Sequence, residues 1–286
     1  MNVDRFRVRS GDEDAVRKHR PDRTPHLDKD EALKSLESSI ERLRKRGEML
    51  YAQSRYSLLL VFQGMDGSGK DSAIKRVMSG VSPQSTHVYA FKAPVGEERE
   101  HDYLWRVSRA LPAKGRIGIF NRSHYEEVLA VRVRPELLAA EGLPLQGTSG
   151  NVWRHRFKDI NAFERHLFRN GTIIRKFFLN ISKDAQRKRM LERLDDPNKN
   201  WKFSTHDLDD RDKWKQFMSA YAEALAATSH EYAPWYVIPA DHKWFAHALI
   251  AEIVLKTLEG LDLDYPKLDP GRRRELALAR RRLLKR

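Results

Sequence analysis

The segment VFQGMDGSGKDSAIKRV, residues 61–77, restricts the possible folds of this chain more than any other stretch. An apolar run typical of a buried strand leads into a glycine-rich loop, and the pattern that follows Lys70 is helical. Gly64, Gly69 and Lys70 satisfy G-x-x-x-x-G-K, the spacing of a loop whose backbone N–H groups and lysine hold phosphate oxygens. The helix adds the positive end of its dipole. These features predict a phosphate-binding loop between a strand and a helix.

Asp71 departs from this pattern, because such loops usually carry Ser or Thr after the lysine, where the hydroxyl binds magnesium. A different group must then hold the metal. Asp66, inside the loop, is the better candidate, since a carboxylate beside phosphates repels them unless a cation lies between. Asp71 either belongs to the phosphate site or only complements the dipole of the helix that it opens.

Apolar strand patterns alternate with helical patterns along most of the chain. The strands are expected at residues 57–64, 87–94, 115–123, 172–182 and 235–240, and the helices at residues 28–53, 70–80, 97–111, 184–194, 209–229 and 244–261. This alternation predicts an α/β fold with a mostly parallel sheet flanked by helices. Ligands of such sheets bind beyond the carboxyl ends of the strands. The phosphate loop and the motif FNRSHYE, residues 120–126, both follow a predicted strand, so we expect them on the same rim of the sheet.

The motif FNRSHYE supplies groups that phosphoryl transfer requires, which are cations for the transferring oxygens and a carboxylate for a metal or an acceptor. Arg122 suits the first role, because a guanidinium binds phosphate through two hydrogen bonds. Glu126 either holds magnesium or orients the acceptor oxygen. We expect His124 to be structural rather than catalytic, and an HExxH-type zinc motif is absent from the sequence.

Basic residues also gather on the predicted helix 184–194. Arg189 and Arg193 are four residues apart and share one face of it. Such a helix either closes over bound phosphates as a lid or only presents a solvated basic face. The residues alone leave both possibilities open.

The composition excludes several classes of protein and favours an anionic ligand. The chain has no cysteine, which excludes disulfides, thiolate nucleophiles and cysteine-ligated zinc. It has no long apolar run, and its N-terminus lacks the apolar segment of a secretory signal, so we expect a cytoplasmic protein that does not span a membrane. The net charge is +14, and the last 16 residues hold eight Lys or Arg against one Glu. This charge indicates either a polyanionic ligand or simply a basic surface.

The sequence divides into three parts. We expect a loosely ordered N-terminal arm at residues 1–28, the main domain at residues 29–265 and a basic C-terminal tail at residues 266–286. Residues 135–150 are expected to form an excursion between two helices. We also expect a homo-oligomer, either a dimer or a tetramer.

Five motifs occur in order along the chain: GMDGSGKD, DYLWRV, IFNRSHYEEVL, FFLNISKDAQRKRMLERLDDPNKNWKFS and EYAPWYVIPADHKWF. Together they resemble the family-2 polyphosphate kinases, and the similarity extends from about residue 33 to residue 261. The resemblance implies a P-loop kinase fold similar to that of thymidylate kinases, with a helical lid at about residues 184–206. It also implies an enzyme that moves phosphoryl groups between inorganic polyphosphate and a nucleotide.

The resemblance also implies roles for individual residues. Asp66 would bind Mg²⁺, with Mn²⁺ as an alternative metal, Lys70 would bind phosphate, and Arg122 would stabilise the transferring group. Much of the family carries Asp where this chain has Asn121, and FNRSHYE resembles the subgroup that phosphorylates both AMP and ADP. Asn binds magnesium more weakly than Asp does, and Glu126 is placed to compensate.

The predicted site therefore has three overlapping groups of residues. The catalytic group is Asp66, Lys70, Arg122 and Glu126, and the metal ligands are Asp66, Asn121 and Glu126. The phosphate-binding group is Gly67, Ser68, Gly69, Lys70, Asp71, Arg122, Arg189 and Arg193. By the resemblance, Arg189 and Arg193 match the arginines of the family's lid helix. The expected reaction moves phosphoryl groups from polyphosphate to AMP and ADP, giving ADP and ATP, and is reversible.

Two other functions compete with this one. An ATP-dependent nucleotide kinase of the P-loop class is the first, and the widespread basic charge and the missing Ser or Thr argue against it. A basic nucleic-acid-binding protein is the second. The sequence shows no helix-turn-helix, zinc finger or aromatic RNA platform, so we expect no nucleic acid among the partners.

Overall fold

Five parallel strands form one sheet in the order β2-β3-β1-β4-β5, in a computed structural model that describes residues 1–25, 27–144 and 152–284. The strands are β1 (Ser57–Gln63), β2 (Thr86–Ala90), β3 (Ile117–Asn121), β4 (Thr172–Asn180) and β5 (Trp235–Pro239). Every residue of β1 is buried, because this strand is central and both faces of the sheet are covered. The predicted α/β fold with a parallel sheet is confirmed.

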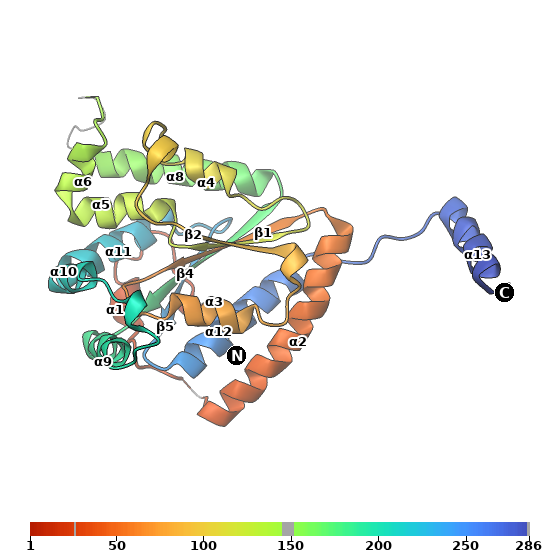
Figure 1. Cartoon of the computed structure of the whole chain (residues 1–286), viewed down its shortest axis with the longest axis horizontal. Helices are drawn as coiled ribbons and strands as arrows, with labels where there is room; N and C mark the ends of the chain where they lie inside the picture. The colour runs from red at the N-terminus through yellow and green to blue at the C-terminus, as the bar shows by residue number, and fades with distance from the viewer. Residues whose placement is uncertain (26, 145–151, 285–286) are drawn as a thin grey trace.

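Helices cover both faces of the sheet (Figure 1). One face carries α2 (Lys29–Gln53), α3 (Lys70–Val77) and α12 (Lys243–Glu259). The other face carries α4 (Trp105–Arg109), α5 (Ala130–Val133), α8 (Val152–Arg169) and α11 (Trp214–Thr228). The helix α12 is buried around most of its circumference, because it packs between the sheet and α2.

Further helices and 3₁₀ turns lie at the edges of these layers and between them. They are η1 (Val3–Phe6), α1 (Ala15–Lys18), η2 (Pro83–Ser85), η3 (Gly96–Arg99), η4 (His124–Val128), α6 (Pro135–Ala140), α9 (Lys183–Leu194), η5 (Asn200–Lys202) and α10 (His206–Asp212). The excursion expected at residues 135–150 begins with α6, and its residues 145–150 lie outside the described part of the chain.

The N-terminal segment differs from the loosely ordered arm that we expected. Val3, Phe6 and Val8 are buried in the main core. The Val8 amide donates to the Trp235 carbonyl at 2.9 Å, and Arg7 forms an antiparallel bridge with Tyr236. This segment therefore covers the outer edge of β5, whose backbone groups would otherwise lack protein partners on that side.

Two predicted helices are interrupted in the structure. The stretch expected at residues 97–111 contains η3 and then α4, and in the turn between them the Asp102 carboxylate accepts from the Leu104 amide at 2.9 Å. The stretch expected at residues 209–229 is divided into α10 and α11. The break separates an acidic segment from an apolar one, and α10 lies beside the candidate site.

The C-terminal helix α13 (Pro270–Leu284) stands apart from the rest of the molecule in Figure 1, at the end of an extended segment. None of the described residues of α13 is buried. Among the described residues, the helices are all too short or too polar to cross a membrane.

Candidate active site

The phosphate loop joins β1 to α3 and depends on glycines at positions of positive φ. Gly64 has φ +150°, and a Cβ there would lie 2.8 Å from the Leu179 carbonyl oxygen and from Ser68 Oγ. Gly69 has φ +99° and caps the start of α3. Ser68 Oγ is buried and has no hydrogen-bond partner within the described chain, so it is available to a phosphate oxygen.

Lys70 is the first residue of α3, and its side chain is folded back under the loop. Its Nζ donates to the Gly64 carbonyl at 2.6 Å and to the Met65 carbonyl at 3.3 Å. Burial lowers the pKa of Lys70, although Asp66, with a carboxylate oxygen 4.0 Å away, opposes this shift. The ammonium group is thus buried directly beneath the phosphate loop.

The carboxyl end of β3 brings a second cation to the loop. Phe62 of β1 pairs with Asn121 of β3, so the residues that follow each strand lie on one rim of the sheet, as predicted. Arg122 donates from its backbone to the Phe62 carbonyl at 3.0 Å, and its guanidinium donates to Asp66 Oδ1 at 2.6 Å. Burial would raise the pKa of Asp66, but the charges of Lys70 and Arg122 outweigh it and hold that pKa below its ordinary value.

Two further residues of the motif FNRSHYE, Glu126 and Asn121, lie near the pair formed by Arg122 and Asp66. Burial raises the pKa of Glu126, and the nearby Arg122 and Lys70 only partly offset that effect. Gln63, with its amide turned to donate, reaches Glu126 Oε1 at 3.0 Å. Asn121 Nδ2 donates to Asp71 Oδ1 at 2.6 Å, so the unusual carboxylate of the loop is paired with the unusual amide of the motif.

The helix α9 lies against the phosphate loop. Gln186 donates to the Asp66 carbonyl at 2.8 Å. Arg189 donates to the Gly67 and Ser68 carbonyls, both at 3.0 Å, and to the Ala240 carbonyl at 2.6 Å. The guanidinium of Arg189 therefore links the loop to the end of β5 in this structure.

The segment after α9 contributes an acidic wall that the sequence reasoning did not identify. Arg193 lies 3.6 Å from Asp207 of α10, and Asp210 of the same helix pairs with Arg134. Burial, reinforced by the charge of Asp66, raises the pKa of Asp207 to about 6. The signal in the sequence was the run DLDDRD at residues 207–212, whose acidic side chains offer partners to the basic residues of α9.

His124 belongs to the interior rather than to the loop. It is buried, and its ring contacts those of Tyr125 and Phe163 at centroid distances of 4.7 and 5.9 Å. Neither imidazole nitrogen has a hydrogen-bond partner within the described residues. This environment agrees with the structural role that we expected.

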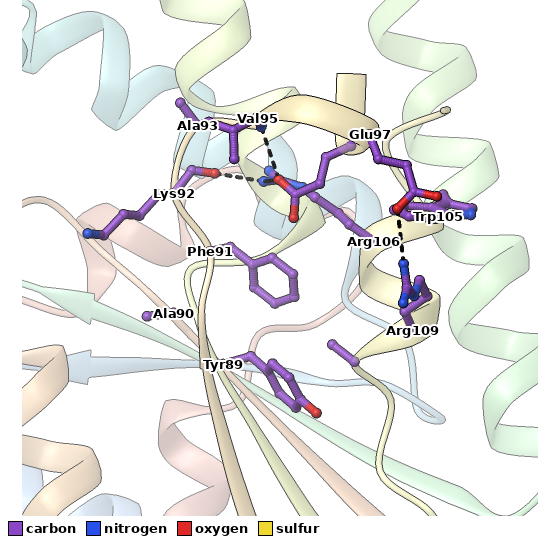
Figure 2. Close-up of a pocket in the computed structure, with 12 residues that line it drawn as sticks. Tyr89, Ala90, Phe91, Lys92, Ala93, Val95, Glu97, Trp105, Arg106 and Arg109 are labelled. Carbon is purple, nitrogen blue, oxygen red and sulfur yellow. Dashed lines mark hydrogen bonds and ion pairs between the residues drawn. The ribbon is translucent and has the colours of Figure 1, made fainter. Parts of the chain in front are cut away.

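A separate cavity of about 630 Å³ lies at the outer edge of β2 and does not include the phosphate loop. Figure 2 shows Tyr89, Phe91 and Trp105 around it, with Arg109 directed at Glu97. Two of its cations are paired, Arg106 with Glu98 and Arg109 with Glu97, and Arg106 also donates to the Lys92 carbonyl at 2.7 Å. Lys70, Arg122 and the unpaired hydroxyl of Ser68 lie instead at the phosphate loop, so we take that loop as the candidate active site.

Known proteins are similar to this chain over most of its length. The family model described as Polyphosphate kinase 2 matches residues 26–265. A protein of Rhodopseudomonas palustris named ADP-polyphosphate phosphotransferase is 48% identical over 251 residues, which are 87% of this chain and 87% of that protein. A protein of Meiothermus ruber named AMP/ADP-polyphosphate phosphotransferase is 44% identical over 265 residues, which are 92% of this chain and 95% of that protein.

The structural comparison agrees with the sequence comparisons. The crystal structure of Polyphosphate Kinase 2 from Arthrobacter aurescens is 38% identical and has a TM-score of 0.87, covering 97% of this chain and 96% of that one. The expected P-loop kinase fold is thereby confirmed. The family model spans the sheet, the phosphate loop, the turn at residues 122–126 that carries Arg122, and the basic helix α9. This chain therefore belongs to the polyphosphate kinase 2 family.

Proposed function

We propose that this protein transfers phosphoryl groups from inorganic polyphosphate to AMP and ADP, giving ADP and ATP, in a reversible reaction. The observation that carries the proposal is the convergence of Lys70, Arg122 and the free hydroxyl of Ser68 on one rim of the sheet. The names of the relatives from Rhodopseudomonas palustris and Meiothermus ruber support polyphosphate as donor and adenine nucleotides as acceptors.

The transfer requires little covalent chemistry from the protein. An oxygen of the acceptor's terminal phosphate attacks the last phosphorus of the polyphosphate, and the P–O bond to the rest of the chain breaks. The donor leaves one phosphate shorter, and the acceptor gains that phosphate. Charge spreads over the transferring oxygens, so positioned cations lower the barrier.

We assign this charge neutralisation to Lys70 and Arg122. In the structure their side chains are bonded to loop carbonyls and to Asp66, and phosphate oxygens would replace those partners. The backbone amides of Gly67 and Gly69, just before α3, would hold the same phosphates, with Asp71 at the edge of that group. Ser68 would add its hydroxyl, because its amide donates to the Met65 carbonyl at 3.0 Å. Arg193 would reach the phosphates from the lid, while Arg189 would keep the lid helix on the loop.

The residues present fit a magnesium ion, with manganese as an alternative. Asp66 and Glu126 offer carboxylate oxygens and Asn121 a neutral oxygen, which are the ligand types that Mg²⁺ prefers. The described residues contain no group of three or more His, Asp or Glu side chains that could hold a metal by themselves. This arrangement suits an ion that takes further ligands from water and substrate phosphates, and such an ion would neutralise phosphate charge.

The test uses the purified protein with ADP, magnesium and polyphosphate, and ATP formation is measured without any added nucleoside triphosphate. We expect ATP to form, and Lys70→Met to lower kcat by roughly a hundredfold or more. The matched control is Lys75→Met, because Lys75 is an exposed lysine on the same helix. AMP phosphorylation that needs ATP and ignores polyphosphate would contradict the proposal and favour an ordinary nucleotide kinase.

The remaining expectations stay predictions. A homo-oligomer would be checked by the mass of the particle in solution. The cytoplasmic location agrees with the need for cellular nucleotides and awaits a direct localisation experiment.

A further inference from the structure

A buried ion pair lies beneath the turn at residues 122–126, which carries Arg122. Lys176 of β4 and Glu164 of α8 have side chains that are 0% and 1% exposed, and Nζ lies 2.5 Å from Glu164 Oε2. Tyr125 joins the two: its hydroxyl accepts from Lys176 Nζ at 2.7 Å and donates to Glu164 Oε1 at 2.9 Å. Lys176 also donates to the Thr228 carbonyl at 2.8 Å, so its three donors are all used.

Aromatic rings close this network from water. The Lys176 ammonium lies 5.2 Å from the ring centroids of both Tyr125 and Trp235. Trp235 contacts Tyr125 edge-on at 4.7 Å, and its Nε1 donates to Thr228 Oγ1 at 2.9 Å. An ion pair so deeply buried is a poor source of stability, because desolvation offsets the attraction between the charges. Its presence therefore calls for a role other than stabilising the fold.

The network is attached to the residues that face the phosphates. Tyr125 follows Arg122 by three positions and directly precedes Glu126. Arg122 has a φ of +62°, which a residue with a side chain adopts at a cost unless its surroundings hold it there. His124 lies between Arg122 and Tyr125 in the sequence, and its Nε2 is 3.7 Å from Glu164 Oε1. The turn that carries Arg122 is thus held from below by β4 and α8.

We propose that Glu164 and Lys176 are positioning residues for phosphoryl transfer. Through Tyr125 they hold the turn at residues 122–126 in one conformation, and this conformation keeps Arg122 and Glu126 beside the phosphate loop. The inference rests on the proposed function of this site. Neither residue touches a substrate, so their loss slows the chemical step more than it weakens substrate binding.

Two variants separate positioning from folding. The double variant Glu164→Leu, Lys176→Met removes both charges and leaves neither one buried alone, which proteins often tolerate without loss of stability. Tyr125→Phe is milder and removes only the hydroxyl that joins the pair. The matched control is Tyr232→Phe, because the Tyr232 hydroxyl donates to the Asn161 carbonyl of the same helix α8 at 3.3 Å and lies outside the network.

For each variant we would measure kcat, KM for ADP, the melting temperature, and amide hydrogen exchange in peptides that cover residues 121–128. We expect kcat to fall by at least about tenfold in the double variant and severalfold in Tyr125→Phe. KM is expected to change less than about threefold. Exchange should accelerate in residues 121–128 and remain unchanged in the phosphate loop. The control Tyr232→Phe should behave as the unmodified protein.

A folded double variant with unchanged kcat and unchanged exchange would overturn the inference. If the double variant does not fold, unchanged kcat and exchange in Tyr125→Phe would overturn it equally. If the unmodified protein does not use polyphosphate, the proposed function fails instead. The exchange data then still decide whether the buried pair holds the turn, since that measurement needs no substrate.

Discussion

At the scale of single residues, the unusual Asp71 of the phosphate loop has a partner in Asn121. Asn121 donates to Asp71 at 2.6 Å, so a carboxylate in the loop and an amide in the arginine motif form one hydrogen-bonded pair. Asp66 is the carboxylate that meets the cations, since its Oδ1 accepts from Arg122 at 2.6 Å. These contacts favour Asp66 over Asp71 as the carboxylate beside the phosphates, and that assignment stays a prediction.

Asn121→Asp should change both metal affinity and acceptor choice. The substitution removes the donor to Asp71 and places two carboxylates against each other, which favours a bound cation between them. We expect the magnesium concentration for half-maximal rate to fall by roughly tenfold, and the ratio of kcat/KM for AMP to that for ADP to change. Steady-state rates over a magnesium series, with each acceptor, measure both quantities.

The control for this prediction exchanges the two residues. Asn121→Asp combined with Asp71→Asn restores one amide and one carboxylate, and hence the hydrogen bond. If the exchanged pair behaves as the unmodified protein, the hydrogen bond matters rather than the carboxylate at position 121. An unchanged acceptor ratio in Asn121→Asp alone would separate this position from acceptor choice altogether.

At the scale of elements, the site depends on how α9 and α12 pack against the phosphate loop and α3. Arg189 connects α9 to the loop and to the residue after β5. On the neighbouring side, His247 of α12 lies 3.5 Å from Ser72 Oγ of α3. Burial, together with the charges of Lys243, Arg76 and Arg189, lowers the pKa of His247 to about 4.

The low pKa of His247 predicts that the fold weakens in mild acid. The unfolded chain takes up a proton on this residue near pH 6.5, whereas the folded protein does so only near its pKa of about 4. The unfolded state therefore binds more protons between these values, and this contribution to stability decreases as the pH falls from 6.5 towards 4. The slope is on the order of 1 kcal/mol per pH unit.

Urea denaturation at pH 7.5, 6.5 and 5.0 measures this dependence. We expect His247→Gln to lose less free energy of unfolding between pH 6.5 and 5.0 than the unmodified protein does. His87→Gln, which changes an exposed histidine on β2, is the control and should follow the unmodified protein. Equal losses in all three proteins would show that His247 does not govern the acid response.

At the scale of the whole molecule, charge is distributed unevenly. The net charge is +14, and half of this excess lies in residues 271–286, which hold eight Lys or Arg against one Glu. The described residues of this stretch, 271–284, lie in the helix α13, which stands away from the sheet and its helices (Figure 1). The tail therefore adds charge without adding to the phosphate site.

Deletion of residues 271–286 should weaken the binding of long polyphosphate chains more than that of short ones, and leave kcat on short chains nearly unchanged. A polyanion long enough to contact both the site and the tail releases more counterions. The slope of log affinity against log salt should therefore become less steep by roughly 0.7 for each tail cation that contacts the chain. Affinities for short and long chains at two salt concentrations measure this effect.

A matched variant keeps the helix and removes part of its charge. Replacing Arg280, Arg281 and Arg282 by Gln should produce part of the effect of the deletion. Equal salt slopes for all three proteins on long chains would remove the tail from substrate binding. A contact between subunits through the exposed Leu276, Leu278, Leu283 and Leu284 would then be the explanation to pursue.

The sequence alone was enough to establish the parallel α/β fold, the phosphate loop and the rim on which it lies. These features depend on local patterns: an apolar strand, glycines that allow positive φ, and a helix that begins at Lys70. The order of the motifs was likewise enough to place the chain in its family. The N-terminal segment was misjudged, because its four buried apolar residues are spread among charged ones and become a core face only when the chain folds against β5, α12 and their neighbours.

Other features depended on contacts between residues far apart in the chain. The pairing of Asn121 with Asp71, the acidic wall of α10 and the ion pair of Glu164 with Lys176 each join elements that no sequence period connects. Lys176 lies in an apolar strand pattern, where a lysine is expected to reach solvent. Only the packing of α8 and η4 against β4 brings the Glu164 carboxylate and the Tyr125 hydroxyl to it, and burial then makes that partnership necessary.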